Sequence, residues 1–189
     1  MIRIGILGAI GSGKSYVAKN FGFPVFNADL EVAKLYQKDK KIFNKLNRKL
    51  PRYIHSFPIQ KKEILNAILA NKNNLSKIIK IVHLEIRKKM KDFLKNHNKS
   101  KIVILDIPLL LENKINKKKD ILVYVNSNKS NLLKRLKKRK NFNQLILNKF
   151  NEIQLSTAYK RKKAHYVINN KFTKKSVKDD IKNIINRIL

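Results

Sequence analysis

The stretch "GILGAIGSGKSY" (residues 5–16) contains four of the five glycines in a chain of 189 residues. Residues 8–15 within it match the pattern GxxxxGK[ST] in full. The apolar run "IRIGIL" (2–7) before it predicts a buried strand, and residues 13–22 predict a helix. This order is typical of a phosphate-binding loop, and a chance match would occur on the order of once in a thousand such chains. The stretch therefore predicts nucleotide binding.

The residue types in this loop suit the triphosphate of ATP. Glycine leaves the backbone free to turn its N–H groups inward, where they and the helix N-terminus favour phosphate oxygens. We expect Gly11, Ser12 and Gly13 to line the loop. Lys14 would reach the β- and γ-phosphates, and the hydroxyl of Ser15 would bind Mg²⁺. The loop alone does not name the reaction.

Positive charge dominates the composition. The formal net charge is +33, from 45 Lys and Arg against 12 Asp and Glu. One interpretation is a protein attracted to nucleic acid or to an anionic membrane. The other is a compositional bias, because lysines occur in every segment and not in one patch between aromatic residues. We favour the second, so neither nucleic acid nor a membrane is expected as an obligatory partner.

Two further features bear on the compartment. The chain contains no cysteine, which excludes disulfides and thiolate metal sites and favours a reducing cytoplasm. Its longest apolar stretch, "IGILGAIG", is too short to cross a bilayer and lacks the flanks of a signal peptide. Cytoplasmic localisation is expected.

Short apolar strands alternate with helical patterns along the chain. Besides 2–7, strands are expected at 24–29, 101–108, 120–126 and 166–169. Helices are expected within 30–50 and 60–97, at 130–138 and 144–163, and from 175. This alternation predicts an α/β fold of three layers, with a five-stranded parallel sheet between helices.

The long helical stretch from 30 to 97 is too large for one crossover and predicts an inserted subdomain. Small size and the lack of an N-K-x-D guanine motif favour a small-molecule kinase, with a lid that excludes water. We expect a single P-loop kinase unit over 1–189. Its core would cover about 1–29, 100–136 and 164–189, with a helical substrate-binding insertion at about 30–99 and a lid at about 137–163.

Three carboxylates are candidates for chemistry. Asp29 closes the second strand and would orient an acceptor hydroxyl and take its proton, or else cap a helix that begins at Leu30. Asp106 ends "IVILDIP" and would hold Mg²⁺ directly or through water, or else serve as a turn residue. Glu112 in "PLLLEN" would face the acceptor or cap a helix.

Arg135 and Arg139 lie four apart on an expected helix, hence on one face. Guanidinium groups suit a transferring phosphoryl group, although a solvated basic face is the alternative. His83 lies on an apolar helical face, where packing is the ordinary explanation. No group of side chains has the spacing of a structural zinc site.

Taken in order, these motifs resemble the dephospho-coenzyme A kinase family over nearly the full length. "GILGAIGSGKS" resembles the family's opening loop, "VFNADLEVAKL" its "DAD" segment, and "IVHLEIR" the "HP" helix of its CoA-binding insertion. "LDIPLLLEN" is similar to the "PLL-E" segment, "LLKRLKKR" with "NEIQ" to the lid, and "AHYVINN" to the "AD-VI-N" ending. This sequence departs from the family's pattern at several positions. Tyr16 stands where the family commonly has threonine, Asn27 replaces the first Asp of "DAD", and Leu84 stands where proline is usual. Gln144 lies near the position of a frequent arginine, His165 and Tyr166 replace an acidic pair, and the stretch at 38–58 is compressed.

The resemblance implies a site. The catalytic residues would be Asp29, Lys14, Arg135 and Arg139. ATP would be bound by Gly11, Ser12, Gly13, Lys14, Ser15, Tyr16 and Asn170, the last beside adenine. The acceptor would be bound by Asp29, His83, Arg87, Leu110 and Glu112, with Gln154 in the lid, and Mg²⁺ by Ser15 and Asp106.

The implied activity is phosphorylation of the ribose 3′-hydroxyl of dephospho-CoA by ATP and Mg²⁺, giving CoA and ADP. One alternative is a nucleoside or nucleotide kinase of the same fold. Another is a basic ATP-binding protein that acts on nucleic acid. A monomer or weak homo-oligomer is expected.

Overall fold

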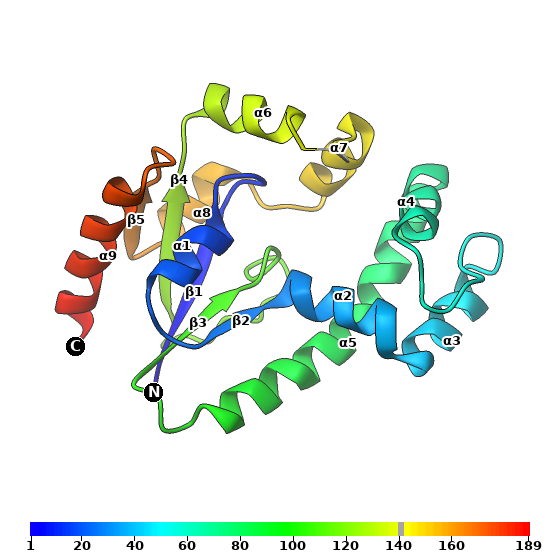
Figure 1. Ribbon diagram of the computed structural model, residues 1–189, viewed down its shortest axis with the longest axis horizontal. Coiled ribbons are helices and arrows are strands. Elements are labelled where there is room, and N and C mark those ends of the chain that lie inside the picture. Colours follow the sequence, from blue (N-terminus) through cyan, green and yellow to red (C-terminus); the bar gives the residue numbers. More distant parts are fainter. Residues whose placement is uncertain (140–141) are drawn as a thin grey trace. The chain divides into compact units, whose positions relative to one another are not determined.

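The computed structural model describes residues 1–139 and 142–189 (Figure 1). The strands within them are β1 (Ile2–Gly8), β2 (Val25–Asn27), β3 (Ile102–Asp106), β4 (Ile121–Asn126) and β5 (Tyr166–Asn169). They form one parallel sheet in the order β2-β3-β1-β4-β5. The predicted α/β fold with a five-stranded parallel sheet is thereby confirmed over the part of the chain that the structure describes.

The described helices are α1 (Lys14–Asn20), α2 (Ala28–Lys38), α3 (Lys40–Lys49), α4 (Lys61–Ala70), α5 (Lys72–Asn96), α6 (Lys129–Lys137), α7 (Gln144–Glu152), α8 (Thr157–Lys163) and α9 (Lys174–Ile188). The chain divides into two compact units. The first comprises Met1–Asn27, His97–Phe142 and Ile153–Leu189, and the second comprises Ala28–Asn96 and Asn143–Glu152. Residues 140 and 141 of the predicted lid lie outside the described residues.

The sheet of the first unit is buried because its central strands are apolar on both faces. β1 and β3 are almost continuously buried, which is typical of parallel strands covered by helices. Helices α1 and α9 cover one face, and α8 packs against β1 and β4 from the other (Figure 1). Side chains at helical spacing on α9 complete the core with those of α1, namely Val177, Ile181, Ile184, Val17, Ala18 and Phe21.

Two expected boundaries are wrong. β2 ends at Asn27 and α2 begins at Ala28, so Asp29 lies in the first turn of a helix instead of closing the strand or capping a helix at Leu30. The pairing of β2 with β3 stops at Asn27, and a carboxylate in the first turn is favoured by the helix dipole. The single helix expected at 144–163 is divided into α7 and α8, because Ser156 caps α8 by accepting a hydrogen bond from the Tyr159 amide.

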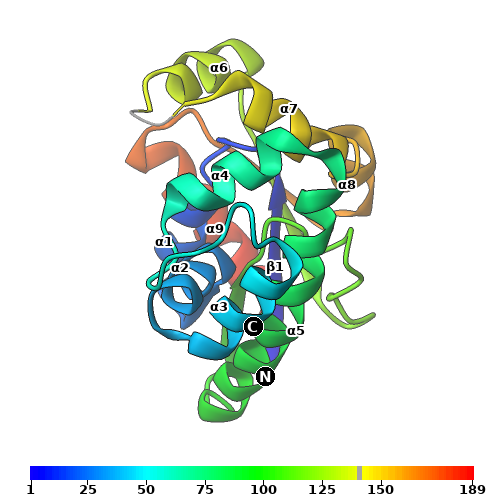
Figure 2. The same ribbon diagram turned by 90° about the vertical axis from the view of Figure 1, so that its right-hand side faces the viewer.

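In the second unit, α5 is the helix that contacts α2, α3 and α4, while α7 packs against α4 (Figure 2). Its buried residues recur at helical spacing: Leu75, Ile78, Val82, Ile86 and Met90. This stripe explains how a strongly basic helix of 25 residues is held in a folded unit.

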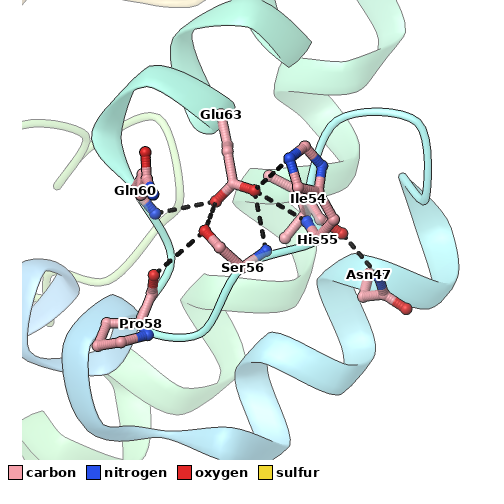
Figure 3. Close-up of polar contacts among 7 residues, drawn as sticks. All are labelled: Asn47, Ile54, His55, Ser56, Pro58, Gln60 and Glu63. Atoms are coloured by element: carbon pink, nitrogen blue, oxygen red, sulfur yellow. Dashed lines mark hydrogen bonds and ion pairs between the residues drawn. The ribbon is translucent and has the colours of Figure 1, made fainter.

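A buried carboxylate organises the irregular segment between α3 and α4 (Figure 3). Glu63 accepts hydrogen bonds from the amides of His55, Ser56 and Gln60, each 2.9 Å long, and from the hydroxyl of Ser56 at 2.7 Å. Burial alone would raise the pKa of Glu63, but these hydrogen bonds outweigh it and lower the pKa to about 2. The charged form of Glu63 therefore stabilises this segment.

We predict that Glu63→Gln lowers the free energy of unfolding by about 3 kcal/mol at neutral pH, since the pKa falls from 4.5 to about 2 on folding. A carboxyl group whose pKa is lowered on folding stabilises the folded state at pH values above its pKa in the unfolded chain. The difference between variant and wild type should therefore shrink as the pH falls from 4.5 toward 2. Urea unfolding of both proteins at several pH values measures this difference in the free energy of unfolding.

Glu85→Gln is the matched control, because Glu85 makes an exposed ion pair with Lys88 on α5. This substitution should lower the free energy of unfolding by less than about 1 kcal/mol. A Glu63 variant as stable as this control at neutral pH would contradict the prediction.

Candidate active site

Gly11 and Gly13 show why the loop between β1 and α1 contains glycine. Gly11 and Gly13 have φ angles of 84° and 89°, in the left-handed region that side chains disfavour. A Cβ atom on Gly11 would lie 2.9 Å from the side chain of Leu136, and one on Gly13 would collide with the amide of Asn170. Close approach by two distant segments therefore explains why glycine is concentrated here.

The carbonyl of Ser12 ties this loop to the neighbouring strands. It accepts hydrogen bonds from the hydroxyl of Ser127, after β4, and from the amide of Asn170, after β5, both 2.9 Å long. The side-chain oxygen of Asn170 in turn accepts from the Phe172 amide at 2.8 Å. The buried Asn170 thus braces the loop, and its predicted place beside adenine stays a prediction. Ser127 was missed by the sequence analysis, although a serine directly after an apolar strand was a visible signal.

Lys14 lies folded across the loop. Its ammonium group donates to the carbonyls of Gly8 at 3.2 Å and Ala9 at 2.8 Å. These are uncharged acceptors, and an ammonium group bonds more strongly to an anionic oxygen. The positive charge is therefore placed within the loop where phosphate would bind.

The ends of β1, β2 and β3 bring together a polar cluster. Asn27 is in register with Asp106, and its amide donates to that carboxylate and lies 3.5 Å from the hydroxyl of Ser15. Burial raises the pKa of Asp106, and the Ser15 hydroxyl and the Lys14 charge partly oppose this. Hydroxyl, amide and carboxylate oxygens are the ligands that Mg²⁺ accepts. Asn27 was noted from the sequence only as a departure, yet it contacts both predicted Mg²⁺ ligands.

Arg135 and Arg139 do not share a helix. α6 ends at Lys137, and Arg139 lies beyond its C-cap with its amide donating to the Leu136 carbonyl at 3.1 Å. Leu136 is the last buried side chain of α6, so the basic residues after it have no apolar contact to extend the helix. The guanidinium of Arg135 lies 4.1 Å from the centre of the Phe172 ring.

Glu112 faces inward. Its carboxylate accepts from the ammonium of Lys160 at 2.7 Å and from the Leu155 amide at 3.0 Å, and Lys160 also donates to Gln154 at 3.0 Å. Lys160 is 1% exposed. These contacts fix the segment between α7 and α8 to the loop after β3. The contact to Leu155 also explains the break in the expected helix.

Of the other predicted residues, Leu110 is buried against Gly5 in the core, and Tyr16 is partly exposed on α1. Asp29 is exposed on α2, while His83 and Arg87 lie one turn apart on α5, half-buried and exposed respectively. These last three belong to the second unit and the glycine loop to the first, so their roles in one site stay predictions.

A polar cavity of about 600 Å³ lies at the carboxyl ends of β4 and β5. Its lining consists of Asn126, Ser127, Asn128, Asn131, Asn169, Asn170 and Lys171. Two of these residues, Ser127 and Asn170, also hold the carbonyl of Ser12. The cavity is therefore adjacent to the phosphate-binding loop within the first unit.

Comparison with known proteins decides the family. The family model for dephospho-CoA kinase matches residues 2–176. The chain belongs to the dephospho-CoA kinase family. It is similar to dephospho-CoA kinase of Wolbachia pipientis wMel, with 31% identity over 98% of this chain and 97% of that protein.

Solved structures share the fold of this chain. TT1252 from Thermus thermophilus matches with a TM-score of 0.80 and 24% identity, covering 100% of this chain and 98% of that one. Dephospho-CoA kinase from Campylobacter jejuni matches with a TM-score of 0.64 and 20% identity, covering 98% and 96%.

Membership of the dephospho-CoA kinase family confirms the predicted activity, a kinase that acts on dephospho-CoA, and favours neither alternative. It also implies ATP as a substrate and a small-molecule acceptor. Among the described residues, no helix combines the length and apolar character needed to span a membrane.

We predict that Gly13→Ala weakens ATP binding at least about tenfold, because the new methyl group displaces Asn170 from the Ser12 carbonyl and leaves buried polar groups unpaired. Gly22→Ala is the matched control. Gly22 also has a positive φ angle, 74°, but open space around it. Both variants should lose about 1–2 kcal/mol of stability from backbone strain. Titration calorimetry with ATP and thermal unfolding separate the effects, and equal ATP affinity of the two variants would contradict the prediction.

Proposed function

We propose that the chain transfers the γ-phosphoryl group of ATP to the ribose 3′-hydroxyl of dephospho-CoA, giving CoA and ADP. The observation that carries this mechanism is the convergence of the glycine loop, Lys14 and the Ser15–Asn27–Asp106 cluster at one edge of the sheet. Ligands of open α/β sheets bind at this edge, beyond the carboxyl ends of the strands.

The loop holds the phosphates of ATP. The backbone amides of Gly11 and Gly13 face phosphate oxygens, while Ser12 shapes the loop, because its amide donates to the Ala9 carbonyl at 3.2 Å. Lys14 exchanges its two carbonyl acceptors for the β- and γ-phosphates. This exchange is favourable because both acceptors gained are anionic. Tyr16, on the first turn of α1, is the neighbouring ATP-binding residue.

Ser15 and Asp106 hold Mg²⁺, with Asn27 orienting the carboxylate. When bound, Mg²⁺ neutralises charge on the phosphoryl oxygens. Asp106 is suited to this task because its burial raises its pKa in spite of its polar neighbours, so a cation would offset the cost of its charge.

Asp29 orients the acceptor hydroxyl and accepts its proton. Consecutive Cα atoms are about 3.8 Å apart, so the Cα atom of Asp29 cannot lie more than about 8 Å from that of Asn27. Chain connectivity thus keeps the backbone of Asp29 close to that of Asn27. Arg135 and Arg139 neutralise charge that develops on the transferred group.

The acceptor is bound by His83 and Arg87 of α5, and Leu110 and Glu112 support it from the loop after β3. Because their side chains are buried, the last two act by shaping this loop. Residues 30–99 form the acceptor-binding insertion, and residues 137–163 form a lid that excludes water. The enzyme works in the cytoplasm as a monomer or weak homo-oligomer, without an obligatory nucleic-acid partner.

An acceptor panel tests the proposal. ADP release is measured with dephospho-CoA, nucleosides and nucleoside monophosphates, with CoA as a control whose 3′-hydroxyl is already phosphorylated. We expect turnover with dephospho-CoA alone. Turnover with a nucleoside or nucleotide, and none with dephospho-CoA, would establish the alternative kinase activity instead.

Within this reaction, we predict that Asp29→Asn lowers kcat by about 10² or more while the Kd for ATP stays unchanged, because the general base is lost and the phosphate-binding loop is intact. Glu31→Gln is the control, with the same loss of charge in the same turn of α2, where Glu31 pairs with Lys34 at 2.6 Å. Its kcat should match the wild type. Equal kcat values for the two variants would show that Asp29 only stabilises the helix terminus.

A further inference from the structure

Lys160 is the only buried side chain within residues 142–163. It is 1% exposed, whereas α7 buries no residue and α8 buries this lysine alone. Burial of an ammonium group is unfavourable unless opposite charge and hydrogen bonds replace the water that it loses. An apolar side chain would be buried there at lower cost, so the lysine requires a reason other than apolar packing.

The ammonium group of Lys160 is held by partners from two separate connections. It donates to the carboxylate of Glu112 at 2.7 Å and to the side-chain oxygen of Gln154 at 3.0 Å. The same oxygen of Glu112 accepts from the Leu155 amide at 3.0 Å. The other oxygen, Oε2, is buried and accepts no hydrogen bond from the part of the chain that the structure describes. The charge of Glu112 therefore depends on Lys160 for its compensation.

The pair also fixes the direction of Gln154. An ammonium group donates hydrogen bonds and accepts none, so the oxygen end of the Gln154 amide must face Lys160. The NH₂ end, which only donates, is then turned away from the pair. An apolar side chain at position 160 would fill the same space without selecting one of the two orientations of this amide.

The loop that contains Glu112 starts directly after Asp106, the last residue of β3. This loop is fixed to the core of the first unit by Leu110, which is 1% exposed. On the other side of the pair, the chain returns from the second unit to the first at Ile153. Lys160 and its partner thus join the returning segment to a loop whose place is already set.

We propose that Lys160 is a positioning residue for phosphoryl transfer, which acts through Glu112 to anchor the returning end of the lid and to orient Gln154. The inference rests on the proposed function, in which residues 137–163 form the lid. A lid contributes to a reaction by holding groups in a defined place, and small displacements reduce the rate. Directional bonds from a buried ion pair suit this task.

A double-mutant cycle tests this inference, with Lys160→Met, Glu112→Leu and the variant that contains both changes. Each single variant leaves one buried charge without its counter-charge and should lower the Tm by about 10 °C. The double variant replaces the pair by apolar groups and should recover most of this loss. Its kcat should nevertheless stay about tenfold below that of the wild type, because the orientation is not restored. Its Kd for ATP should be unchanged, since the phosphate-binding loop is intact.

The ion pair of Arg3 and Asp120 provides the matched control. It is also buried, with a distance of 2.9 Å, and Asp120 likewise accepts from a backbone amide, that of Lys117 at 2.8 Å. It joins the amino ends of β1 and β4, at the opposite end of β1 from the glycine loop. The double variant Arg3→Met, Asp120→Leu should therefore keep the kcat of the wild type.

Hydrogen exchange measures the anchoring without any acceptor. In the double variant of Lys160 and Glu112, the amides of residues 153–156 should exchange at least about tenfold faster than in the wild type, while those of β1 keep their protection. A wild-type kcat in this variant, an equal loss of kcat in the Arg3 and Asp120 variant, or unchanged exchange would each overturn the inference. If the wild type does not phosphorylate dephospho-CoA, the proposed reaction is wrong, and the exchange rates alone decide whether the pair anchors this segment.

Discussion

Parallel pairing of the strands is the constraint on which the site depends. Parallel neighbours must be joined by crossovers, so the carboxyl ends of all strands in this sheet meet at one edge. The register then places Asn27 opposite Asp106 and brings the end of β1 beside both β3 and β4. The Ser12 carbonyl completes the arrangement by accepting from Ser127 and Asn170. A phosphate-binding loop without these neighbours would have little to fix its shape.

Carboxylates are scarce in this basic chain, and several of them are buried. Glu63 gathers three amides and a hydroxyl, and Asp120 pairs with Arg3 at 2.9 Å near the amino ends of β1 and β4. Asp106 differs, because burial raises its pKa and its partners compensate only in part. A carboxylate whose hydrogen bonds outweigh the cost of burial stabilises a fold, whereas one whose burial is only partly compensated is suited to a cation. The sequence alone does not tell these two uses apart.

The errors of sequence-based prediction share one physical origin. Local spacing indicated one helix over 144–163, but Glu112 binds the amide of Leu155 across 43 positions and the helix is broken there. Spacing also placed Arg139 on α6, whereas the helix loses its last buried contact at Leu136. In both places a contact between distant segments, or the lack of one, outweighed local propensity.

The sequence by itself determined the strands, the order of most helices, the glycine loop and the family, because apolar periodicity and residue spacing are local properties of the chain. Only the tertiary structure decided that Asn27 lies against Asp106, that Glu112 faces Lys160, and that Arg135 stacks on Phe172. Each of these contacts joins segments far apart in the sequence. Their partners are selected by strand register and helix packing, which no local pattern encodes.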